Sequence, residues 1–205
     1  MEFSELYKML VKEMSAPWSD YVNPITTVQN RWNDHKAHCK KIKDFFTMYG
    51  AKINVYLYDE EKLKRMFFIS EDVPRGNINF YVLENGGIEI YEMIKGVPYE
   101  FHMSDVFKNY LLENFSFILS SAFHTKDGFG LYRRLSKDPS IKFTIIDSNT
   151  DEEITLDNPD DLDNYYGKGK QNFVYKIEKK MKSLIPKGGD DKIYTPDSLA
   201  KNLLE

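Results

Sequence analysis

The chain has very little cysteine and no long apolar run. Cys39 is the single cysteine among 205 residues, so no intramolecular disulfide can form and a reducing compartment is indicated. No stretch approaches the ~20 apolar residues that a membrane-spanning helix needs. The first residues mix acids with lysines and lack the apolar region of a signal peptide. We therefore expect a cytoplasmic protein without a membrane segment.

An excess of charge of one sign is also missing. The chain has 28 Lys and Arg against 32 Asp and Glu, a formal net charge of −4, which gives no general attraction to nucleic acid or anionic membranes. Aromatic residues are abundant, at 15% of the sequence, and they argue against disorder. A chain of this length can bury about 70% of its unfolded surface. We expect one domain over residues 1–185, followed by a C-terminal tail at 186–205.

The N-terminal half changes its apolar period once. Apolar residues at helical spacing predict a helix over residues 2–14 and a second helix over residues 27–49, which Gly50 would end. The period then falls to two, which is typical of strands. Strands are predicted at residues 52–58, 65–70, 77–83 and 88–94. The short turns between them favour hairpins, so we expect an antiparallel meander.

Helices and strands alternate after the meander. A helix is predicted over residues 103–114 with Ser104 as its N-cap. The next elements are predicted as a strand at 115–121, a helix at about 126–137 capped by Thr125, and strands at 141–147 and 172–177. The connection from 121 to 141 contains a helix, so the strands on either side of it should be parallel with a right-handed crossover. The fold class is therefore α+β.

This order of elements resembles the GCN5-related N-acetyltransferase (GNAT) family. The local resemblance lies in the segments FSFILSS, GFGLYRRL and IKFTIID, between residues 115 and 147. In that family two early helices precede an antiparallel meander, and a helix then leads into a strand, a second helix and a final strand or pair. The resemblance covers roughly residues 2–178 in topology and about thirty residues in motif.

The resemblance implies roles for a tyrosine and a carboxylate. Tyr132 stands where the family often keeps a tyrosine that protonates the departing CoA thiolate, a role that suits a phenol. The alternative is that Tyr132 packs on the inner face of its helix. Glu89 and Glu92 are the candidates, by position, for a group that accepts the proton of an attacking amine. Their spacing would put them on opposite faces of a regular strand, so at most one could face a cleft.

The resemblance also locates the expected cofactor contacts. The family holds the CoA pyrophosphate on backbone amides of a Q/R-x-x-G-x-G/A turn after the meander, where small residues let phosphate approach. Lys95, Gly96 and Val97 occupy that place here, and Ser120 ends the following strand, where open sheets tend to bind ligands. Pro98 lacks an N–H, so the turn departs from the family pattern. We expect no cofactor, or acetyl-CoA if the chain is active.

Two further patterns bear on metal and partner binding. His35, His38 and Cys39 fall within the second predicted helix at spacings that could share zinc, but a closed site needs four ligands and lysines lie between them. We expect a solvated basic face and no bound metal. The segment 147–163 holds eight acids and no Lys or Arg. It indicates a protein partner with a basic surface. Asp147 could also cap the loop that follows it.

The sequence thus supports two functional hypotheses. The first is a catalytically degenerate GNAT-like domain that acts as a protein-binding or assembly factor. Viral accessory and virion proteins are one setting for such folds, in the host cytoplasm or in the virion. The alternative is an acyl-CoA-dependent N-acyltransferase with Tyr132 as general acid. The departure of the phosphate turn from the family pattern favours the binding protein.

Overall fold

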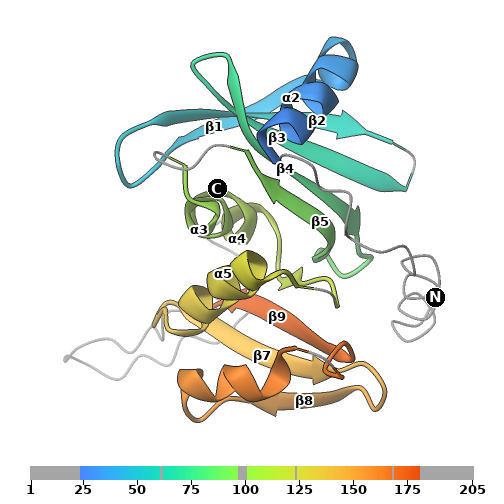
Figure 1. Cartoon of the computed structure of the whole chain (residues 1–205), viewed down its shortest axis with the longest axis vertical. Helices are drawn as coiled ribbons and strands as arrows, with labels where there is room; N and C mark the ends of the chain where they lie inside the picture. Colours follow the sequence, from blue (N-terminus) through green and yellow to red (C-terminus); the bar gives the residue numbers. More distant parts are fainter. Residues whose placement is uncertain (1–23, 61, 97–100, 123, 168, 181–205) are drawn as a thin grey trace, which may run out of the picture.

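A nine-stranded mixed sheet organises the chain (Figure 1). The computed structural model describes residues 24–60, 62–96, 101–122, 124–167 and 169–180. The strand order is β1-β2-β3-β4-β5-β6-β9-β7-β8, and helices complete an α+β fold. The predicted helix at 2–14 and the predicted tail at 186–205 lie outside the described residues. None of the helices in the described ranges is long and apolar enough to cross a membrane.

The first half of the sheet is an antiparallel meander. Its strands are β1 (Lys40–Phe46), β2 (Lys52–Asp59), β3 (Leu63–Ser70), β4 (Val73–Val82) and β5 (Ile88–Lys95). Each pairs antiparallel with the next. The predicted four-strand meander is therefore confirmed, and β1 extends it by one strand at its outer edge.

The second predicted helix is wrong in its C-terminal half. Helix α2 covers Pro24–His35, a short 3-10 helix η2 covers Lys36–His38, and the chain then becomes extended at Cys39 and forms β1. The apolar residues after Cys39 also fit helical spacing, which misled the prediction. Pairing with β2 favours the strand over the helix, because it places Phe45 opposite Ile53 in the core. A tertiary contact here overrides a local periodicity.

The helices of the second half agree closely with the sequence. The elements α3 (Met103–Val106), η3 (Phe107–Leu111, a π-helix) and α4 (Leu112–Asn114) follow one another over the predicted range, although His102 rather than Ser104 is the N-cap. Helix α5 covers Lys126–Ser136. The Thr125 hydroxyl caps it as predicted, accepting a hydrogen bond from the Gly128 amide over 3.1 Å.

Four short strands complete the sheet. They are β6 (Ile118–Leu119), β7 (Ile141–Asp147), β8 (Glu152–Thr155) and β9 (Phe173–Lys179). β6 pairs parallel with β5, and β9 lies antiparallel between β6 and β7. β6 and β7 therefore run parallel, joined by α5, as predicted. They are not neighbours, because β9 separates them.

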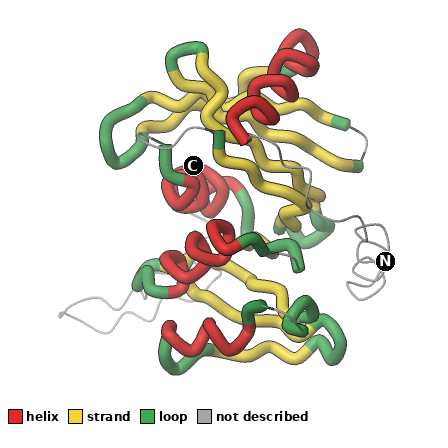
Figure 2. The backbone as a smooth tube through the Cα atoms, viewed as in Figure 1, coloured by secondary structure: helices red, strands yellow, loops and turns green. Residues whose placement is uncertain are grey.

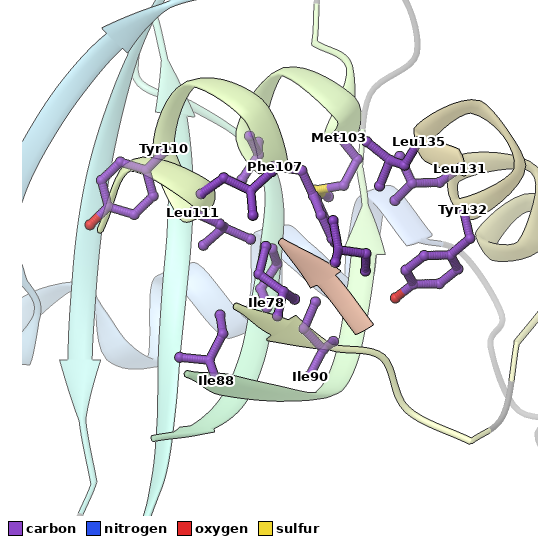
Figure 3. Close-up of a cluster of buried hydrophobic side chains, with 14 of the residues drawn as sticks. Ile78, Ile88, Ile90, Met103, Phe107, Tyr110, Leu111, Leu131, Tyr132 and Leu135 are labelled. Atoms are coloured by element: carbon purple, nitrogen blue, oxygen red, sulfur yellow. The ribbon is translucent and has the colours of Figure 1, made fainter. Parts of the chain in front are cut away.

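The main core lies between the sheet and helices α3–α5 (Figure 3). Strand residues Ile78, Ile88 and Ile90 pack there with helix residues, which include Phe107, Leu111, Leu131, Tyr132 and Leu135. Figure 2 shows these helices between the meander and strands β7–β9. Helix α2 covers the other face of the meander, with Trp32 packed on Tyr56 and Phe67.

Candidate functional site

A β-bulge puts both predicted carboxylates on one face of the sheet. On β4, Tyr81 pairs with Glu89 and Asn79 pairs with Glu92, and the register shifts between these pairs. Tyr81 and Asn79 are two residues apart on one strand, so their partners share a face. The expectation of opposite faces, drawn from a regular strand, does not hold because Tyr91 is an extra residue in β5.

Glu92 is the centre of a buried polar network under α2. Its side chain is 8% exposed. The Arg31 guanidinium reaches it from α2 with both terminal nitrogens, Nη1 donating to Oε2 and Nη2 donating to Oε1 over 3.3 Å. The amide of Asn79 donates to Oε2 over 2.8 Å. This buried carboxylate therefore has a paired charge and a neutral donor.

The network continues to β3 and to the end of α2. Nε of Arg65 donates to Oδ1 of Asn79 over 2.8 Å, and its Nη1 contacts Nε2 of His35. The imidazole of His35 stacks on Tyr58, with ring centroids 4.5 Å apart. Burial, and then the nearby Arg65, lower the pKa of His35. The neutral imidazole can therefore accept from the guanidinium.

Glu89 lies on the same face but outside this network. It is 4% exposed, and its Oε2 accepts no hydrogen bond from the residues that the structure describes. Burial raises the pKa of Glu89 to about 7. A carboxyl group in this state can exchange a proton near neutral pH, a property shared by many general acids and bases.

Tyr132 is on the other side of the sheet, in the main core. It is 2% exposed, and its ring lies 4.8 Å from that of His124 and 5.3 Å from that of Tyr175. Burial, and then Tyr175, raise the pKa of its phenol above the usual range. The structure thus does not bring Tyr132 together with Glu89 and Glu92. Its position is that of an inner-face packing residue, the alternative noted above.

Ser120 is enclosed where β6 meets β9. It is 0% exposed, its hydroxyl donates to the Ser121 carbonyl over 2.9 Å, and it accepts from the Tyr175 amide over 2.9 Å. Nε2 of His124 lies 3.4 Å away, but burial lowers the pKa of His124 to about 4, so this imidazole is a weak base. The hydroxyl joins the end of β6 to β9, and its one proton is already donated to a backbone carbonyl.

The predicted phosphate turn is described only in its first two residues. Burial, and then Arg134, lower the pKa of Lys95, the first of them. The Gly96 amide donates to the Arg75 carbonyl over 2.8 Å, so this N–H is engaged by the backbone. A Cβ at Gly96 would lie 3.4 Å from Val28 of α2, an ordinary van der Waals contact, so α2 packs on this turn without requiring a glycine. Val97 lies outside the described residues.

The acidic segment 147–163 is folded rather than an open loop. It contains β8 and the 3-10 helix η4 (Pro159–Tyr165). Asp147 caps the turn after β7, its Oδ1 accepting from the amides of Asn149 and Asn172 over 2.9 and 2.8 Å. Other acids of the segment pair with Arg133 of α5, with Lys137 directly after α5, and with Lys176 of β9. Four exposed acids make no ion pair within the described residues: Asp151, Glu152, Asp157 and Asp161.

His35, His38 and Cys39 do not share a helix. His35 ends α2, His38 ends η2 and Cys39 precedes β1. The helix predicted over all three was therefore wrong at this point. In the part of the chain that the structure describes, no three His, Cys, Asp or Glu side chains come together as a metal site would need.

An apolar surface that the sequence did not predict lies at the β1–β2 turn; we call Phe46, Met48 and Tyr49 the hairpin tip. Phe46, Met48 and Tyr49 are 62%, 72% and 64% exposed. Gly50 has φ of +81° and belongs to a hairpin turn rather than to a helix end. If residues 40–46 are read as a strand, this glycine predicts the turn between β1 and β2.

Hydrogen bonds fix the hairpin tip against the helix that starts at α3. The Met48 amide donates to Asp105 over 3.3 Å, and the Asn109 side chain donates to the Phe46 carbonyl over 3.5 Å. The Tyr49 ring lies 5.4 Å from that of His102. The exposed apolar side chains are therefore presented by an anchored backbone.

Three lysines of the edge strand β1 precede the hairpin tip along the strand. Lys40, Lys41 and Lys43 are exposed, and the register with β2 shifts between Lys41 and Lys43, which makes a bulge at Ile42. We call the three lysines and the hairpin tip together the β1 surface. It combines an apolar patch with positive charge and can contact an acidic protein.

Comparison with models of protein families, with curated proteins and with solved structures finds no match for this chain. Glu92 lies beneath α2 and Glu89 is buried on the same face of the sheet. Tyr132 and Ser120 are enclosed in the core, and the β1 surface is open to a partner.

Proposed function

We propose that this chain is a GNAT-like domain without catalytic activity that binds another protein through the β1 surface. The observation that carries the proposal is the hairpin tip, where Phe46, Met48 and Tyr49 are 62%, 72% and 64% exposed on an anchored turn. Aromatic residues and methionine are enriched in protein interfaces.

The anchored turn lowers the cost of binding. A flexible loop loses conformational freedom when it meets a partner, which subtracts from affinity. Here the hydrogen bonds from the turn to Asp105 and Asn109 have already ordered the backbone. Burial of apolar surface contributes about 25 cal/mol per Å², so three large side chains can supply a useful part of the binding free energy.

The fold and the placement of the candidate residues support the rest of the proposal. A meander, a helix and a strand–helix–strand unit (β6–α5–β7) follow in the order that suggested the GNAT family. The groups proposed for acyl transfer lie on different faces of the sheet, and Tyr132 is enclosed. This separation favours the binding protein over the enzyme.

A photo-crosslinking residue at position 48 tests the proposal. In cells that express the chain naturally, replacement of Met48 should give discrete protein adducts, and the Phe46→Ser/Tyr49→Ser background should abolish them. Val82, which is 49% exposed at the far end of β4, is the matched control position and should give none. Equal adducts at positions 48 and 82 would contradict the proposal.

One observation favours the alternative, an acyl-CoA-dependent N-acyltransferase. Glu89 has a pKa raised to about 7 by burial, which suits a general base. Titration calorimetry with acetyl-CoA at low salt distinguishes the two functions. We expect a dissociation constant no better than about millimolar, or ~4 kcal/mol. Micromolar binding that adenosine diphosphate displaces would put the enzyme first.

A further inference from the structure

The two edges of the nine-stranded sheet carry opposite charge. Strand β1 begins the sheet and holds Lys40, Lys41 and Lys43. Strand β8 ends the sheet and holds Glu152 and Glu153, within the acidic segment 147–163. The edges lie at opposite ends of the molecule (Figure 1). One end of the molecule is therefore complementary to the other end of a second copy.

We propose that β8 of one copy adds to β1 of another, so that the chain associates with itself from head to tail. The inference rests on the proposed function, because it names a second copy as a partner of the β1 surface. Such a contact joins two different patches, so it leaves one free edge of each kind and can extend to longer assemblies.

Both strands have a free side for backbone pairing. Among the described residues β1 pairs only with β2, and β8 pairs only with β7. A free edge exposes N–H and C=O groups that can take an added strand. Edge lysines hinder the addition of most strands. An acidic strand is favoured instead, because opposite charges across a strand pair attract.

The lengths of the two strands also agree. After its bulge, β1 has four regular pairs with β2, from Lys43 to Phe46, and β8 has four residues. Asp44 lies within this part of β1, and its negative charge would repel an acidic strand. Lys41 and Lys52 offset that charge, since their Nζ atoms lie 3.5 and 3.0 Å from the carboxylate. A contact of this length buries less than the ~1,200 Å² of stable complexes, so the association should be weak.

Sedimentation of the purified chain tests the inference. The weight-average mass should rise with concentration at about 0.1 M salt and should return toward the monomer at about 1 M, where the Debye length falls to about 3 Å. The variants Lys40→Glu/Lys43→Glu and Glu152→Lys/Glu153→Lys should each self-associate about tenfold more weakly. Loss of the exposed Glu153–Lys176 pair should have little effect on folding.

Mixing and recombining the variants gives the decisive results. The lysine variant has two acidic edges and the glutamate variant has two basic edges, so an equimolar mixture should regain head-to-tail assembly that neither variant shows alone. The four-site variant, with both charges exchanged, should regain self-association. A peptide of residues 150–157 should inhibit assembly of the unaltered chain. The same peptide with alternate N-methylated amides should not, because it cannot donate to a strand.

The outcomes separate this inference from the proposed function. A chain that remains monomeric at low salt, or two peptides that inhibit equally, would overturn edge pairing between copies. Neither result affects adducts with a different protein at position 48. Conversely, self-association that the charge exchanges control would stand even if position 48 gave no adduct with a different protein.

Discussion

Arg31 of α2 and Glu92 of β5 form an ion pair that ties the helix to the middle of the sheet. The two residues are 61 positions apart, and the guanidinium contacts both carboxylate oxygens. Asn79 supports the same carboxylate from the neighbouring strand. The contact fixes α2 over a polar part of the sheet face where apolar packing alone would not specify its position.

Removing one partner of this pair should destabilise the protein. Arg31→Met leaves the Glu92 carboxylate buried without its guanidinium, and we expect the free energy of unfolding to fall by about 3 kcal/mol. Arg31→Met/Glu92→Gln should lose less, because the remaining amide is neutral. Urea unfolding at pH 7 measures both. Lys142→Met, at the exposed pair with Glu178, should cost less than about 1 kcal/mol. Equal losses in the single and double variants would contradict this account.

Glu89 should make stability depend on pH. Its pKa rises from 4.5 in the unfolded chain to about 7 in the fold, so the protonated form is favoured by about 3 kcal/mol. This contribution is fully present below pH 4.5 and is lost as the pH rises through 7. Relative to their difference at pH 4, Glu89→Gln should therefore gain about 3 kcal/mol over the unaltered chain at pH 8. Urea midpoints from pH 4 to 8 test this, and the exposed Glu84→Gln should follow the unaltered profile.

Two glycines should respond differently to alanine. A Cβ on Gly76 would lie 2.9 Å from the Ile94 carbonyl oxygen, which belongs to the backbone of β5, so Gly76→Ala should cost about 2 kcal/mol. At Gly87 the Cβ would meet the ring of Phe117, whose half-buried side chain can rotate away. Gly87→Ala should therefore cost less. Chemical unfolding measures the loss of stability in both variants. A larger loss for Gly87→Ala would show that the backbone of β5 shifts more easily than the Phe117 ring rotates.

The start of α5 depends on Thr125. Thr125→Ala removes the acceptor of the Gly128 amide and should cost about 1 kcal/mol, whereas Thr125→Ser should retain most of the stability. Hydrogen exchange at the Gly128 amide gives a local measurement. It should accelerate in the alanine variant alone. Unchanged exchange would mean that packing of α5 holds the turn without the cap.

The elements that the sequence predicted correctly are those with strong local signals. In the meander, apolar residues recur at every second position between turn residues. In α5, the N-cap residue is followed by inner-face residues at helical spacing. β1 was missed because Ile42, Phe45 and Phe46 fit a helix as well as a strand, and only the distant Ile53 distinguishes them. Local patterns carry no information about such a partner.

The candidate site was less predictable for the same reason. Glu89 and Glu92 were chosen from their place in the sequence, but their common face depends on a bulge in the pairing of β5 with β4. The network partners Arg31 and Arg65 come from α2 and β3, and no spacing in the sequence relates them. Exposure of the hairpin tip likewise follows from where the sheet ends.

The position of β9 sets an order on folding. Phe173–Lys179 is the last of the described strands in the chain, yet it lies between β6 and β7 and pairs with both. As the chain leaves the ribosome, the meander can assemble from neighbouring hairpins, because its contacts are local. β6 and β7 cannot be joined in the sheet until β9, which pairs with both, has been synthesised. The part of the sheet from β6 to β8 is therefore completed by the insertion of one late strand. Until then, the edges of β6 and β7 that will pair with β9 are open to other molecules.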